Sequence, residues 1–138
     1  MKFLLDTHVV HAAADPNAAK PLSGKAREAI AACTRDDLAI SAITLLEFAR
    51  HLRDGMVGAK DRVGWLERIE ENVTVIPITA RLAYSSTAMP WRRRDGKEHA
   101  DPADRLIVAT AIRHQLEIIG DDAEMRHISA THGFTMLW

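Results

Sequence analysis

Short apolar runs alternate with stretches of helix length along the whole chain, and this alternation constrains the fold more than any other feature of the sequence. Several of the runs are rich in β-branched residues, which is typical of buried strands. They fall at residues 3–5, 38–41, 73–76 and 117–119, with a predicted edge strand at 134–138. Strands that alternate with helices form parallel sheets, and right-handed connections place the helices on both faces. We therefore expect an α/β fold with a doubly wound, central parallel sheet.

The stretches between these runs have the apolar spacing and the end signals of helices. The first ends at Asp15-Pro16, the second has Ser23 as its cap, and the third ends at Gly55. Helices are expected over residues of about 7–14, 45–54, 60–71 and 102–114, after Ser23 through Cys33, from Thr79 to before Pro90, and in a short segment before residue 134. Residues 89–100 form a long irregular connection.

Length and composition limit the classes of protein that such a chain can represent. A chain of 138 residues predicts one domain, residues 1–138, with a single core. The formal net charge of −1 excludes a generic polycation that coats nucleic acid. The one cysteine, Cys33, excludes an intramolecular disulfide and fits a reducing compartment. Apolar runs are too short for a membrane span or a signal-peptide core, so we expect a cytoplasmic protein.

The positions of the carboxylates are the most informative feature for function. Asp6 follows the first predicted strand, and Glu47 lies in the helix after the second. Asp101 and Asp104 begin the helix after the long connection, and Asp122 follows the fourth strand. Because the junctions from strand to helix share one edge of a parallel sheet, we expect acids from four distant segments to converge there.

Each acid also has a plain structural explanation. Thr44 and Glu47 match a capping box, Asp101 with Pro102 matches the start of a helix, and Asp6 or Asp122 can cap the helix that follows it. Four carboxylates gathered at one edge, however, repel one another unless a cation lies among them. Clustered hard oxygen ligands suit Mg²⁺ or Mn²⁺, which polarises a phosphate and lowers the pKa of bound water.

Five segments in this order resemble the PIN-domain ribonucleases of the VapC toxin family, over nearly the full length of the chain. They are FLLDTHV at 3–9, SAITLLEFA at 41–49, HADPADRLIVATA at 99–111, IIGDD at 118–122 and the terminal Trp138. The resemblance implies a three-layer α/β/α fold with a central parallel sheet and Mg²⁺- or Mn²⁺-dependent cleavage of RNA. It also implies pairing with a small antitoxin, usually within a homodimer.

The resemblance assigns the catalytic and metal-binding acids residue by residue. Asp6, Glu47, Asp104 and Asp122 match the four acids of the family in order. Asp101 belongs to an Asp-Pro-x-Asp-Arg variant of the third motif and is either a further metal ligand or a helix cap.

Two positions near these acids need separate comment. Asp121 is interpreted as a solvated neighbour of Asp122. Gly120 departs from the family, which usually has threonine two residues before the fourth acid. Without the threonine hydroxyl, a hydrogen bond that supports a metal-binding acid is in doubt, although the acid itself is not.

Basic residues of the long connection are candidates for RNA binding. Arg92, Arg93 and Arg94 can bind phosphates, and Trp91 can stack on a base. A solvated loop is the plainer interpretation, and the place of the loop just before Asp101 keeps RNA binding open. Arg105 is the strongest arginine candidate outside the loop, because it adjoins Asp104.

Two histidines, His8 and His11, are three residues apart on the first predicted helix. That spacing can bind Zn²⁺, but the sequence offers no obvious third nitrogen or sulfur ligand, so we interpret them as ordinary helix residues.

The sequence thus predicts a divalent-metal-dependent endoribonuclease, the toxin of a type II toxin–antitoxin pair, that cleaves RNA with water activated at the metal. One alternative is a metal-dependent nuclease outside such a system. Another is a doubly wound regulatory module that binds Mg²⁺ at the same edge. A phospho-receiver of that kind needs a lysine late in the chain, whereas Lys97, the last lysine, precedes the fourth strand.

Overall fold

A five-stranded, all-parallel sheet forms the middle layer of the molecule, as the alternating sequence predicts. The computed structural model describes residues 1–15, 17–57 and 61–138. The strand order is β3-β2-β1-β4-β5. The strands are β1 (Phe3–Leu5), β2 (Leu38–Ser41), β3 (Thr74–Ile76), β4 (Glu117–Ile119) and β5 (Met136–Leu137).

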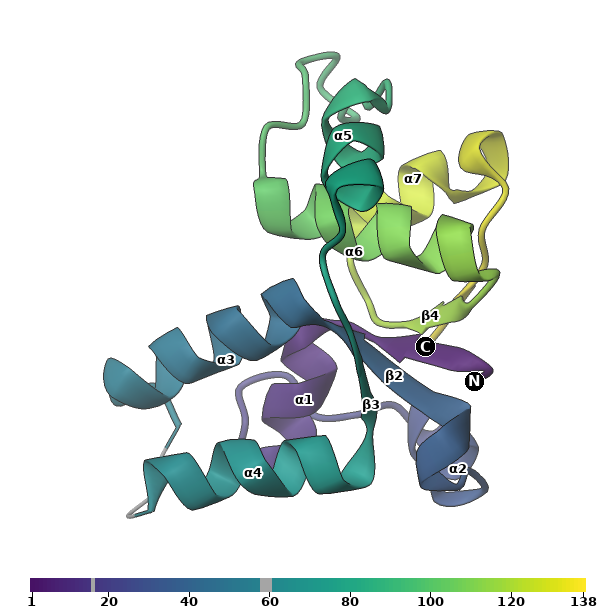
Figure 1. Cartoon of the computed structure of the whole chain (residues 1–138). Coiled ribbons are helices and arrows are strands. Elements are labelled where there is room, and N and C mark those ends of the chain that lie inside the picture. The colour runs from purple at the N-terminus through teal and green to yellow at the C-terminus, as the bar shows by residue number, and fades with distance from the viewer. Residues whose placement is uncertain (16, 58–60) are drawn as a thin grey trace.

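Helices cover both faces of this sheet. In the described residues they are α1 (Thr7–Ala14), α2 (Gly24–Ala31), α3 (Ala42–Arg53), α4 (Arg62–Asn72), α5 (Ala80–Ala88), α6 (Pro102–His114) and α7 (Ala123–His132), with a short 3₁₀ helix, η1 (Arg35–Asp37). Figure 1 shows α6 and α7 on one side of the sheet and α1 and α4 on the other. The three-layer α/β/α fold is therefore confirmed. Within the described residues, no helix is both long and apolar enough to cross a membrane.

The strands divide their side chains between two cores. Leu4 and Ile118 pack with α6 and α7, whereas the next residues along the same strands, Leu5 and Ile119, pack with α1, α2 and α3. All four side chains are nearly or fully buried. This two-residue alternation follows from the pleat of a strand, and it explains why these runs are apolar throughout.

Most of the predicted elements agree with the structure to within one to three residues at their ends. The main difference is α3, which begins at Ala42 and has Ser41 as its cap position. Thr44 therefore lies inside the helix, fully buried, and its hydroxyl has no hydrogen-bond partner among the described residues. The predicted capping box of Thr44 and Glu47 is wrong, and Glu47 instead accepts a hydrogen bond from Thr7.

The order of the strands sets where a ligand can bind. The chain runs outward from β1 through β2 to β3, and then crosses back to add β4 and β5 on the other side of β1. The direction of winding thus reverses between β1 and β4, and ligands of open parallel sheets bind at the carboxyl edge of such a reversal.

Candidate active site

The four predicted acids come from four elements that meet at this carboxyl edge. Asp6 follows β1 and is the N-cap of α1, and Asp122 follows β4 and is the N-cap of α7. Glu47 lies on α3, which follows β2. Asp104 lies in the first turn of α6, whose N-terminus is at the same edge because the helix leads back to the start of β4.

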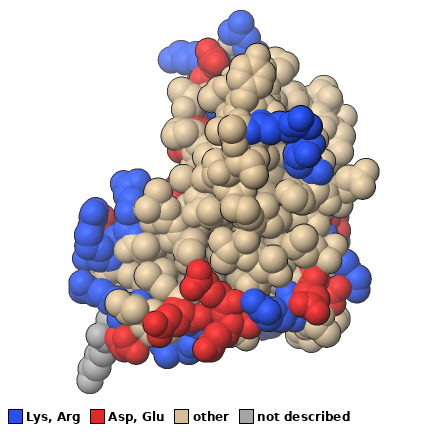
Figure 2. All heavy atoms as spheres, in the orientation of Figure 1, with Lys and Arg blue, Asp and Glu red and all other residues tan. Residues whose placement is uncertain are grey.

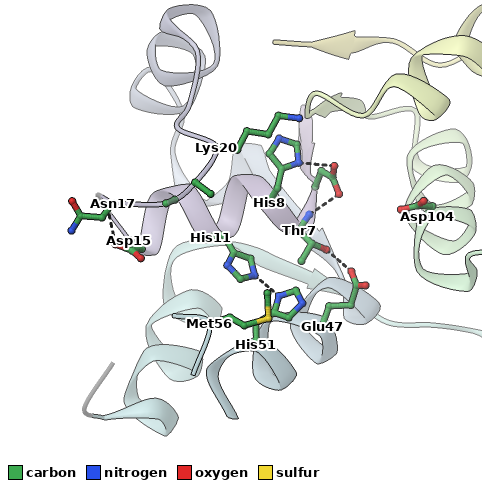
Figure 3. A pocket seen from close by; sticks show the side chains of 13 residues that line it. Thr7, His8, His11, Asp15, Asn17, Lys20, Glu47, His51, Met56 and Asp104 are labelled. Atoms are coloured by element: carbon green, nitrogen blue, oxygen red, sulfur yellow. Dashed lines mark hydrogen bonds and ion pairs between the residues drawn. The ribbon is translucent and has the colours of Figure 1, made fainter. Parts of the chain in front are cut away.

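A cavity of about 590 Å³ opens between these elements, and Asp6, Glu47 and Asp104 line it. Figure 3 shows Glu47 and Asp104 reaching toward the same space from opposite sides, one from α3 and the other from α6. Asp122 does not line the cavity, but its charge acts on Asp104. The structure therefore brings the four acids to one edge, three of them around one cavity.

Asp6 is buried, and two donors fix its carboxylate. Oδ1 accepts the backbone N–H of Thr7 at 2.7 Å, and Oδ2 lies 2.9 Å from Nδ1 of His8. Nε2 of His8 accepts the backbone N–H of Asp121 at 3.3 Å, so the proton of the neutral ring is on Nδ1 and is donated to Asp6. Trp138 packs edge-on against this ring, with centroids 5.0 Å apart. His8 thus orients the first acid of the site.

Glu47 and Asp122 each use one oxygen in a structural contact. The hydroxyl of Thr7 donates to Oε2 of Glu47 at 2.6 Å, and the backbone N–H of Met125 donates to Oδ1 of Asp122 at 2.7 Å. Among the described residues the second oxygen of each carboxylate has no partner. Capping and ligation are therefore compatible, because a capping carboxylate still has an oxygen for a cation.

Asp104 has the most strongly perturbed carboxyl of the site. Burial, and after it the charges of Asp101, Asp122 and Asp6, raise its pKa from 3.8 to about 7, against the lowering effect of a hydrogen bond from His99. Nε2 of His99 lies 2.7 Å from Oδ2 of Asp104, and the His99 ring stacks on Trp91. The raised pKa thus reflects burial first and the neighbouring carboxylates second, and the contact with His99 offsets it only in part.

This donor set fits a hard divalent cation. The unpaired oxygens of Glu47, Asp104 and Asp122 are carboxylate oxygens, which Mg²⁺ and Mn²⁺ prefer. As the side chains stand, no group of three or more acidic, histidine or cysteine residues in the described part of the chain is close enough to hold a metal ion.

Asp101 acts as the N-cap of α6. Its Oδ1 accepts the backbone N–H of Ala103 at 2.8 Å, and Pro102 follows at the first helical position. Asp101 is therefore a helix cap. Its second oxygen has no partner among the described residues, so the alternative that Asp101 is also a metal ligand stays open.

The arginines proposed for RNA binding divide into two groups. The connection between α5 and α6 places Arg92, Arg93 and Arg94 on the surface, and Figure 2 shows basic side chains at this tip of the molecule. Arg94 is paired with Glu124 of α7 at 3.1 Å. Arg105 differs from the prediction, because it is only 6% exposed and its guanidinium donates to groups of the chain itself.

Trp91 is also unavailable to a base, since it is 2% exposed and belongs to the core above the sheet. The connection that carries it is ordered by an antiparallel bridge between Arg92 and Glu98. The long loop is therefore a packed feature with an exposed basic tip.

Gly120 follows β4 and lies directly against Asp6. A Cβ at this position would be 2.9 Å from Cβ of Asp6 and 3.1 Å from its Oδ2, closer than side chains tolerate. The departure from the usual threonine thus has a steric reason, and His8 supplies a hydrogen bond to Asp6 in its place.

We expect Gly120→Ala to displace Asp6 and to lower metal affinity or cleavage about 10- to 100-fold, the usual effect of disturbing the support of a ligand. Titration with Mn²⁺ measures the affinity directly. Gly24→Ala is the matched control, because nothing lies within 4 Å of a Cβ at Gly24. Equal Mn²⁺ affinity in the wild type and Gly120→Ala would contradict this role of Gly120.

Three residues support the acids: Thr7, His8 and His99. The sequence indicated that His99 could approach the acidic edge, but it did not identify the supporting contacts of any of the three. Thr7 and His8 follow Asp6 directly, and His99 precedes Asp104 by five residues, so closeness to a predicted ligand was the signal available. The pairing of His8 and His11 on a shared metal also does not occur, because His8 contacts Asp6 and His11 contacts His51.

Comparison with known proteins gives consistent matches in sequence and in structure. The family model described as PIN domain matches residues 3–130. Ribonuclease VapC22 of Mycobacterium tuberculosis is 34% identical over 125 residues, which cover 89% of this chain and 88% of that protein.

Solved structures match over nearly the whole chain. They include FitAB bound to an IR36 DNA fragment (TM-score 0.69, 21% identity, 98% of this chain and 93% of that chain). VapC20 of Mycobacterium tuberculosis, described as a sarcin-ricin loop cleaving toxin, has a TM-score of 0.68 and 19% identity, with 97% of both chains covered. A toxin–antitoxin complex from Klebsiella pneumoniae has a TM-score of 0.62 and 21% identity, with 99% and 97% covered. At these identities the structures support the fold alone.

Proposed function

The chain belongs to the PIN-domain family, and from this we propose that it is a divalent-metal-dependent endoribonuclease, the toxin of a type II toxin–antitoxin pair. The observation that carries the proposal is the convergence of Asp6, Glu47, Asp104 and Asp122 at one edge of the sheet, with a pKa of about 7 at Asp104. Such a shift, caused by burial and by neighbouring carboxylates in a cavity, is characteristic of a catalytic site.

The residues that would hold the ion are Asp6, Glu47, Asp104 and Asp122, with Asp101 as a further candidate ligand beside them. When bound there, Mg²⁺ or Mn²⁺ polarises the scissile phosphate and lowers the pKa of water at the site. The cation also removes the repulsion among the carboxylates that raises the pKa of Asp104.

The chain itself supplies orientation. His8 donates to Asp6, Thr7 donates to Glu47, and His99 contacts Asp104, so three of the four acids have a side-chain partner that limits their rotation. Supporting contacts of this kind fix ligand geometry before substrate binds. The exposed arginines Arg92, Arg93 and Arg94 are proposed to attract the RNA backbone toward this edge.

We propose a small antitoxin protein as the partner, and a homodimer as the form in which this single-domain chain binds it, in the cytoplasm. The similarity to a VapC ribonuclease and to the fold of a toxin–antitoxin complex supports this assignment over a nuclease outside such systems. A short open reading frame beside the gene that encodes a binding partner would favour it further.

Cleavage of total cellular RNA by the purified protein, freed of any antitoxin, tests the proposed function. With Mg²⁺ or Mn²⁺ we expect discrete fragments, and with EDTA none. Glu47→Gln retains an acceptor for Thr7 but lowers the ligand charge, so cleavage should fall at least about a hundredfold. Glu67→Gln, the same change at an exposed site on α4, is the matched control.

Metal-independent cleavage, or full activity in Glu47→Gln, would contradict the assignment of these acids. Well-folded wild-type protein that cleaves no RNA in either metal would leave the Mg²⁺-binding regulatory module as the better interpretation.

A further inference from the structure

A pair of histidines lies one helical turn from the acidic site along the same two helices. Thr7 of α1 contacts Glu47 of α3, and His11, four residues after Thr7, contacts His51, four residues after Glu47. Four residues of an α-helix advance by about 6 Å. The two contacts therefore form successive steps along the groove between α1 and α3, and all four residues line the same cavity (Figure 3).

The outer nitrogens of this pair are open. Nε2 of His11 and Nδ1 of His51 contact each other, whereas Nδ1 of His11 and Nε2 of His51 have no partner among the described residues and are not buried. Phe48 packs edge-on against the His11 ring and holds it in place, with centroids 5.1 Å apart. The pair thus presents two free polar atoms from a fixed position.

The other lysine and histidine side chains at this cavity are already engaged. Lys20 is paired with Asp121 at 3.1 Å and donates to its backbone oxygen, and His8 is held between Asp6 and Asp121. Among the described residues that line the cavity, His11 and His51 are therefore the ones still available to offset the negative charge of an anion bound beyond the metal site.

The charge of the pair depends on pH. A contact between two ring nitrogens needs a proton on one of them and a lone pair on the other, so the paired rings carry at most one positive charge. Burial lowers the pKa of His11, and His51 and His8 lower it further, against the opposing effect of Asp15. Glu47 and Lys20 also line the cavity, and Asp54 lies close enough for His51 to lower the pKa of its carboxyl.

We propose that His11 and His51 bind the phosphate of the nucleotide next to the cleaved bond. This inference rests on the proposed ribonuclease function and names the part of the RNA that the cavity holds beyond the metal site. The step of about 6 Å between the two contacts is comparable with the spacing of neighbouring phosphates in an extended strand. An imidazolium is a donor well suited to a phosphate oxygen, and both histidines line the cavity with one nitrogen each outside their mutual contact.

Binding of a phosphate should then be linked to uptake of a proton. An anion beside the pair favours the charged ring, so it raises the histidine pKa, and RNA affinity must increase as the pH falls through the histidine range. Asp104, with a pKa of about 7 in the same cavity, also contributes to this linkage, so a histidine pair with no role in binding would leave the double variant with the full pH dependence of the wild type.

The test measures binding of a fluorescent single-stranded RNA oligonucleotide by anisotropy, in EDTA so that nothing is cleaved, at about pH 6 and about pH 8 over a series of KCl concentrations. The test variant is His11→Gln/His51→Asn, whose amides place a polar atom near Nε2 of His11 and Nδ1 of His51 but cannot become charged. His114→Gln, at the far end of α6 from Asp104, is the control for titration of an unrelated histidine.

We expect the wild type and His114→Gln to bind about tenfold more tightly at the lower pH, with a salt slope steeper by about 0.7 than that of the double variant, as for one phosphate contact. The double variant should lose the part of the pH dependence that the histidines contribute and keep the part due to Asp104, while its melting temperature stays close to that of the wild type. If it does not fold, His51→Asn alone replaces it.

Equal pH and salt dependence in wild type and variant would overturn the histidine proposal. The same preparations are assayed for cleavage in Mg²⁺, so the two proposals fail separately. A wild type that cleaves RNA but shows no linked binding refutes the histidine pair alone. A wild type that never cleaves, but whose binding depends on pH and salt more steeply than that of the double variant, supports the phosphate site and refutes the proposed function.

Discussion

Asp104→Asn is expected to reduce RNA cleavage by about a thousandfold or more and, at the same time, to stabilise the metal-free protein at neutral and alkaline pH. Loss of activity follows because the neutral amide removes a charged ligand at the centre of the four acids. The gain in stability follows because the charged form of Asp104 is unfavourable in the folded protein without metal, owing to burial and to Asp101, Asp122 and Asp6.

The pH dependence of this gain follows from linkage. The pKa of Asp104 is about 7 in the folded protein and 3.8 in its ordinary state, so between these values the folded chain keeps a proton that the unfolded chain has lost. The free energy of unfolding of the wild type therefore falls as the pH rises through about 4 to 7. Above that range the deficit is complete. A shift of about three pKa units at about 1.4 kcal/mol each gives about 4 kcal/mol as an upper limit, and solvent screening of the partly exposed carboxyl reduces it.

Urea denaturation in EDTA at about pH 5 and about pH 8 measures the effect. Asp104→Asn should exceed the wild type clearly at the higher pH and only slightly at the lower. Asp36→Asn, the same change at an exposed site in η1, should be within about 0.5 kcal/mol of the wild type at both. Added Mg²⁺ should stabilise the wild type and not the variant. A variant that is less stable than the wild type at both pH values would refute the electrostatic account.

Local sequence signals were sufficient to predict the fold and the edge at which the acids gather. Each apolar run is followed or preceded by a helix with recognisable ends, such as Ser23 before α2 and Asp101-Pro102 before α6. Asp6 and Asp122 directly follow strands, so their place at the carboxyl edge follows from the topology alone.

Contacts between segments that are distant in the sequence could not be predicted in the same way. The capping box at Thr44 satisfied every local rule, yet α3 begins three residues earlier and Glu47 pairs with Thr7, forty positions away. His11 and His51 are likewise forty positions apart. One sequence shows what a side chain can do, whereas packing decides which distant group it contacts.

The contacts of Arg105 are another feature that local sequence signals did not predict, and its substitution is expected to lower the stability of the protein strongly. Its guanidinium donates to the backbone oxygens of Ser86, Met89 and His99, and its Nη2 lies 3.2 Å from Oε1 of the exposed Glu98. A planar guanidinium with five N–H donors can serve several carbonyls at once. Arg105 therefore joins the end of α5 and the loop that carries His99 to α6.

Arg105→Met keeps most of the apolar volume but leaves these carbonyls without a donor, so we expect the free energy of unfolding to fall by about 3–5 kcal/mol. Arg105→Lys keeps the charge but cannot reach three acceptors, and it should lie between Arg105→Met and the wild type. Arg113→Met, at an exposed position of the same helix, should change stability by less than about 0.5 kcal/mol.

Cleavage by Arg105→Lys distinguishes this structural role from the RNA contact that the sequence suggested. If Arg105 acts by holding the loop, His99 loses its fixed place beside Asp104, and kcat should fall more than KM rises in protein that remains folded. A direct phosphate contact would instead raise KM, lower the salt slope of RNA binding by about 0.7 and leave stability unchanged. Because the side chain is almost fully buried, we expect the first pattern.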